Sequence, residues 1–195
     1  MIISYHDAFF FKEAGYSSVQ NTERLTEALS KLVEAYKDAS CYFNRGDIKS
    51  EQYNQMVKNR AEFTAYFLIV TAGNLDGPQL LVSSTQQRQK QLEHPKERAL
   101  VNEALKIRLK IESSDTAGFF KLFQSKKTNY LFSCLMLNFY HKKLEQLISQ
   151  VKRATCVAAS HRFQTDLLSR KLGLSEDDVK DLIEAVGYDF DEPVQ

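Results

Sequence analysis

The chain of 195 residues contains few of the residues that break helices or form cross-links. It has seven glycines, three prolines, three cysteines and no tryptophan. So few glycines and prolines leave little room for turns. Cys41, Cys134 and Cys156 are an odd number at wide spacings, and they lack the spacing of a zinc site. We therefore expect three reduced, structural thiols and no metal.

Long hydrophobic runs are also missing. The longest, at residues 130–140, falls well short of the roughly 20 residues that a membrane-spanning helix needs, and it indicates a buried helix instead. Residues 1–15 lack a basic start and place charges inside an apolar run, so they do not resemble a secretory signal. The sequence predicts an intracellular protein that does not act at a membrane.

The usual signatures of catalysis are absent as well. There is no glycine-rich loop to hold a phosphate, and the four histidines are scattered without a nucleophile or carboxylate pattern near them. We expect no catalytic residues, no cofactor and no small-molecule substrate.

Charge, in contrast, is strongly segregated although the net charge is only +1. Residues 118–174 carry two acids, Glu145 and Asp166, against a large basic excess. The basic residues are Lys121, Lys126, Lys127, Lys142, Lys143, Lys152, Arg153, Arg162, Arg170 and Lys171. Residues 175–195 reverse the balance, with eight acids and one lysine, Lys180. The C-terminal half is therefore polarised, which indicates charged interaction surfaces.

Hydrophobic spacing predicts helices through most of the chain. Residues 21–38 place Leu25, Leu29 and Tyr36 on one stripe, and no segment before the tail alternates like a strand. Further helices are predicted at residues 60–73, 95–111, 116–125 and 128–153. The predicted fold class is all-α, with antiparallel helical hairpins stacked like a solenoid but without a fixed-period repeat.

A helix-turn-helix pattern follows at residues 163–187. Leu172 belongs to the apolar face of the first helix, Gly173 supplies the turn, and Val179 belongs to the facing stripe of the second. We expect two parts, a helical stack over 1–155 and a small winged-helix module over 156–195. The sequence stops where a wing hairpin would follow, so we expect the wing to be incomplete.

The long helix predicted at 128–153 has one polar face. Lys142, Gln146, Ser149 and Arg153 share it, at positions i, i+4, i+7 and i+11. We interpret this face as a surface for the phosphate backbone of RNA or DNA, without base readout. The alternative is a solvated helix face. The candidate residues are Lys142, Lys143, Lys152, Arg153, Arg162, Arg170 and Lys171.

The second helix of the module is acidic, which disfavours major-groove reading because phosphates would repel it. The acids at 176–178 fit a capping role at the start of a helix. The later acids have no such explanation. We interpret them as a surface that docks a basic patch on a partner, with a solvated face as the alternative. The candidates are Asp181, Glu184 and Asp189.

Several segments together resemble the PCI architecture, in which a helical solenoid runs directly into a winged helix, and within it the SAC/GANP family of mRNA-export scaffolds. The segments are residues 18–38, 59–73 and 101–154 and the module itself. Within them, Glu62, Phe63, Ala65 and Tyr66 look like the family's acid-aromatic-small-tyrosine stretch, and Phe119 and Phe120 look like its paired phenylalanines. Residues 40–57 look like an insertion, and the family's N-terminal helices before the region of Tyr5 are not represented.

The resemblance implies a non-enzymatic nuclear scaffold, with the nuclear pore as a candidate location. Family members pair with a second PCI protein, joined by a small acidic disordered subunit, and present a basic surface to RNA or DNA. The alternative is a purely structural PCI subunit of a proteasome-lid, signalosome or translation-initiation assembly. Phe119, Phe120 and Phe123 are predicted to be core residues, because side chains that stack on bases must be exposed.

Overall fold

The computed structural model describes residues 1–11, 15–73 and 95–157, together with residues 169, 170, 172, 175–177, 179 and 180. Within these ranges the chain forms helices and turns and no strand, which confirms the all-α prediction. The helices are α1 (Ile2–Phe11), α2 (Ser18–Arg45), α3 (Ser50–Val57), α4 (Arg60–Val70), α6 (Pro95–Glu112), α7 (Thr116–Phe123) and α8 (Tyr130–Val157). None of these described helices combines the length and the apolar character needed to span a membrane.

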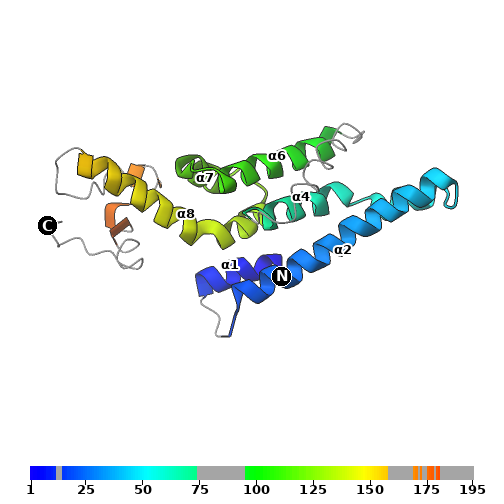
Figure 1. Cartoon of the computed structure of the whole chain (residues 1–195), viewed down its shortest axis with the longest axis horizontal. Helices are drawn as coiled ribbons and strands as arrows, with labels where there is room; N and C mark the ends of the chain where they lie inside the picture. Colours follow the sequence, from blue (N-terminus) through cyan, green and yellow to red (C-terminus); the bar gives the residue numbers. More distant parts are fainter. Residues whose placement is uncertain are drawn as a thin grey trace.

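Helix α4 is the central element of the packing. It lies between α2 and α6 and also contacts α8 (Figure 1). Apolar side chains surround its whole circumference, so it must be covered on every side. Leu68 and Ile69 are fully buried, as expected for a helix that its neighbours enclose. Gly73, beyond the end of α4, has a φ of 84°, a left-handed conformation that glycine adopts at low cost.

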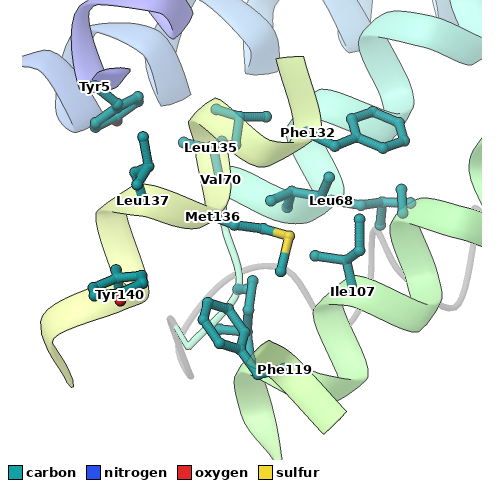
Figure 2. Packing of buried hydrophobic residues seen from close by; sticks show 14 of the residues in the cluster. Tyr5, Leu68, Val70, Ile107, Phe119, Phe132, Leu135, Met136, Leu137 and Tyr140 are labelled. Carbon is teal, nitrogen blue, oxygen red and sulfur yellow. The ribbon is translucent and has the colours of Figure 1, made fainter. Parts of the chain in front are cut away.

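The core extends from α4 into the helices that follow it. Figure 2 shows Phe119 of α7 and Met136 of α8 pointing toward Ile107 of α6. All three are fully buried, and the exposed fraction of Phe120 is 1%. The prediction of core residues is confirmed for Phe119 and Phe120, whereas Phe123, predicted with them, is half-buried and packs against the core. Helix α7 packs between α6 and α8, while α1 packs along α8.

Residues 40–57, which the sequence marks as an insertion, form the tip of a helical hairpin. Helix α2 continues to Arg45, Gly46 turns the chain with a φ of 83°, and α3 folds back along α2. Phe43 and Tyr53 stack across the hairpin, with ring centroids 4.4 Å apart and an interplanar angle of 13°. No residue of α3 is buried. The hairpin therefore extends away from the core (Figure 1).

Only part of the predicted helix-turn-helix falls within the described residues. Leu172 and Val179, assigned to facing stripes, are both buried, with exposed fractions of 1% and 0%. The Val179 amide donates a hydrogen bond of 3.1 Å to the Ser175 carbonyl, as in a first helical turn. Most of residues 156–195 lie outside the described ranges. The module, its wing and the boundary at residue 155 stay predictions.

Candidate nucleic-acid interface

The polar face predicted for the long helix is present on α8. Lys142 and Arg153 are exposed, and Gln146 and Ser149 between them are half-buried. The opposite side of the same turns belongs to the core and consists of Leu144, Leu147 and Ile148. Helix α8 is thus apolar toward the body and polar toward solvent over residues 142–150.

A hollow of about 350 Å³ lies on this polar face. Its lining consists of Ser114, from the turn between α6 and α7, and of Glu145, Gln146, Ser149, Gln150 and Arg153 from α8. The lining carries one acid and one base, with hydroxyl and amide groups between them. Such a lining suits a polar ligand that brings both hydrogen-bond donors and negative charge.

Hydrogen bonds fix the turn between α6 and α7 against α8 and so shape the hollow. The Gln150 Nε2 group donates to the Ser114 carbonyl at 2.9 Å, and the Thr116 hydroxyl donates to Gln150 Oε1 at 2.8 Å. Asp115 caps α7 by accepting the Gly118 amide at 2.8 Å, and it also pairs with Lys110. The wall opposite α8 is therefore held in place by several independent contacts.

Lys143 lies apart from the exposed cations with which the sequence groups it. Its exposed fraction is 2%, and its Nζ donates to the Ser113 carbonyl at 2.6 Å. Burial lowers the pKa of the Lys143 ammonium, and the neighbouring charge of Lys142 lowers it further. One residue along a helix turns the side chain by about 100°, which carries Lys143 from the polar face into the contact with the α6–α7 turn. We therefore leave it out of the proposed contact surface.

The structure describes only some of the other candidates. Arg170 is exposed. The side chain of Lys152 and the whole of Arg162, Lys171, Asp181, Glu184 and Asp189 lie outside the described residues. Their roles stay predictions. Among the residues that are described, no group of His, Cys, Asp or Glu is arranged to hold a metal ion.

Sequence reasoning did not identify Ser114, Glu145 or Gln150 as parts of the site. Ser114 is more than thirty residues away in sequence from the other residues that line the hollow. No feature of the sequence around Ser114 indicates that its carbonyl faces α8. Glu145 and Gln150 do have a local signal, because they follow Lys142 and Gln146 at three and four residues along the same helix.

Glu62 and Tyr66, which carry part of the family likeness, have a structural role. The Tyr66 hydroxyl donates to Glu62 Oε1 at 2.6 Å, and the Tyr66 ring meets Phe132 of α8 edge to face at 5.8 Å. Burial, together with the Glu62 carboxylate, raises the pKa of Tyr66, so the phenol stays a hydrogen-bond donor. The motif joins α4 to α8 and thereby positions the helix that carries the polar face.

Comparison with known proteins gives one result. The model of the SAC3/GANP family matches residues 1–192 of this chain. No curated protein and no solved structure matches it. The family match covers the core helices, the polar face of α8 and the positions of the predicted module, and the chain therefore belongs to the SAC3/GANP family.

Proposed function

We propose that this protein is a non-enzymatic scaffold subunit of a nuclear mRNA-export complex. The observation that carries the proposal is the family match, which extends over residues 1–192. The SAC3/GANP family is a family of scaffold proteins related to nuclear export. In this function the helical body holds partner proteins, and the polar face of α8 binds the backbone of RNA.

The chemistry of α8 supports the RNA contact. Lys142 and Arg153 lie eleven residues apart on one exposed face, which is about 16 Å along the helix axis. Cations spaced in this way contact separate phosphates of a strand that follows the helix. Gln146 and Ser149 between them offer hydrogen bonds, and Glu145 adds one negative charge to the same lining. The face therefore suits backbone contact that is independent of base sequence.

Charge reversal on α8 tests this contact. We expect the pair Lys142→Glu and Arg153→Glu to weaken RNA binding about tenfold or more at low salt, because two charge-assisted interactions become repulsive. The slope of log affinity against log salt should fall by about 0.7 for each phosphate of a single strand that is no longer neutralised. Fluorescence anisotropy with the full chain, purified together with the proteins it retains, measures both quantities.

A matched control changes the same amount of charge elsewhere. Lys49 and Lys58 are exposed beside α3, at the end of the molecule away from the second half of α8 (Figure 1). Lys49→Glu with Lys58→Glu should leave the affinity and the salt slope nearly unchanged. If both double variants weakened binding equally, net charge and not the α8 face would determine the affinity.

The partner side of the proposal concerns the acidic residues of the module. We propose that Asp181, Glu184 and Asp189 dock a basic patch on a second PCI protein. A small acidic disordered subunit joins the two PCI proteins. Asp181→Lys with Glu184→Lys is expected to weaken the pairing about tenfold, since like charges then face each other. Glu23→Lys with Glu34→Lys, at exposed positions of α2, is the control. Quantitative co-purification of the partner measures the effect, and unchanged recovery would remove the docking role.

Affinity purification from native extract tests the assembly itself. Recovery of one PCI protein with a small acidic subunit and with nuclear-pore or transcription components is the expected result. Recovery of a proteasome-lid, signalosome or initiation-factor set would contradict the export function and would make this chain a structural subunit of that assembly.

A further inference from the structure

The hollow on α8 contains two glutamines in contrasting states. Gln150 is engaged at both ends, since its Nε2 donates to the Ser114 carbonyl and its Oε1 accepts from the Thr116 hydroxyl. The Oε1 atom of Gln146, one helical turn earlier, is buried and has no hydrogen-bond partner in the described part of the chain. A buried carbonyl oxygen without a donor is unfavourable, and native proteins rarely keep one without a reason.

The Gln146 amide oxygen is therefore free to accept a hydrogen bond from a ligand that brings a donor. Because Oε1 has no bond to give up, the amide can turn further into the hollow without losing one. Gln150 has no such freedom, because turning its amide breaks two hydrogen bonds. Of the two glutamines, Gln146 is thus the one whose amide oxygen is uncommitted.

The charges around the hollow indicate which part of a nucleic acid fits there. Glu145 contributes a carboxylate to the lining, and the Gln146 amide oxygen, which is buried, adds a second acceptor once the amide turns into the hollow. A phosphate has no hydrogen to donate and would be repelled by Glu145. The cations that attract phosphates, Lys142 and Arg153, lie on either side of these acceptors along the helix. A sugar of the strand that runs between the two cations is therefore the unit that fits the hollow.

We infer that the α8 face selects RNA over DNA, because the Gln146 amide oxygen accepts a hydrogen bond from a ribose 2′-hydroxyl. This inference rests on the proposed RNA contact. The sugar-phosphate backbone of DNA carries no donor at this position, whereas RNA carries one on every nucleotide. Lys142 and Arg153 supply affinity that both nucleic acids share, and Gln146 supplies the discrimination.

The test compares strands of identical sequence and length that differ only at the 2′ position. RNA, DNA and 2′-fluoro RNA are titrated against the full chain with its retained partners at one salt concentration. The 2′-fluoro strand keeps an RNA-like sugar conformation but lacks the donor. We expect RNA to bind about fivefold more tightly than either of the others, the effect of one hydrogen bond. Equal binding of RNA and the 2′-fluoro strand would overturn the inference while leaving the proposed RNA contact intact.

Two variants assign the preference to Gln146. Gln146→Met keeps the length of the side chain and removes the acceptor. This variant should bind RNA as weakly as the wild type binds the 2′-fluoro strand, and its salt slope should equal that of the wild type. Gln146→Glu keeps an acceptor and should retain the preference at a lower overall affinity. Gln20→Met, at an exposed position of α2, is the matched control and should behave as the wild type.

The outcomes separate this inference from the proposed function. If the wild type bound none of the three strands, both would fall. If Gln146→Met kept the full preference for RNA, the assignment to Gln146 would be wrong. If Gln146→Met instead lost a protein partner and kept its RNA preference, the hollow would be a peptide site and the inference would be overturned.

Discussion

Phe119→Ala is expected to lower the free energy of unfolding by about 3–5 kcal/mol, the usual cost of removing a fully buried phenylalanine. Phe119 is 0% exposed, meets Phe120 edge to face at 5.4 Å, and stacks on Phe123 at 6.4 Å. Helix α7 has eight residues, so it depends on these rings to stay between α6 and α8. Denaturant unfolding followed by circular dichroism measures the change.

Leu109→Ala is the control for this experiment. Leu109 lies on α6 and is 63% exposed, so its truncation should change the stability by about 0.5 kcal/mol or less. An equally small effect for Phe119→Ala would mean that α7 can leave the body without disturbing the other helices.

Arg108→Leu should cost about 2–3 kcal/mol of stability, because it leaves buried acceptors without their donor. Arg108 is 5% exposed, and its Nη1 group donates to the Leu68 carbonyl and to the Thr71 hydroxyl, each at 3.0 Å. The guanidinium thus binds the C-terminal end of α4, where the helix dipole is negative. Thermal and denaturant unfolding of the full chain measure the loss.

Arg108 also forms an ion pair, and a second variant separates its contribution to stability from that of the hydrogen bonds. Its Nη2 lies 2.7 Å from Glu112 Oε1, and the Glu112 side chain is 38% exposed. Glu112→Gln should therefore cost less than about 1 kcal/mol, as for other partly solvated pairs. If Glu112→Gln were as damaging as Arg108→Leu, the ion pair would be the main contribution and the binding of the α4 terminus a minor one.

The main helices are predictable from sequence because their apolar periods are local. The predicted ranges 21–38 and 128–153 fall almost entirely inside α2 and α8. Helix α1 is not predictable from hydrophobic periodicity, since its sequence is apolar on nearly all sides and has no clear period. Its position depends on tertiary contacts such as the edge-to-face packing of Phe9 on Tyr140 at 5.1 Å.

The candidate site is less predictable than the fold. Helical spacing correctly groups Lys142, Gln146 and Arg153, because a straight helix fixes which residues share a face. It does not reveal that Lys143 turns inward, since that depends on the Ser113 carbonyl, thirty residues away in sequence. It also cannot indicate an acceptor without a partner, such as Gln146 Oε1, because this property belongs to the packed surroundings and not to the residue type.

The hairpin of α2 and α3 is a part of the fold whose length can change without affecting the core. Helix α2 runs outward, α3 returns beside it, and α4 then packs against α2. Whole helical turns could be removed from, or added to, both the end of α2 and α3. This change would shift the tip at Gly46 without displacing α4, because no residue of α3 is part of the core. Residues 40–57 are thus a place where evolution can lengthen or shorten the chain while the packing around α4 stays the same.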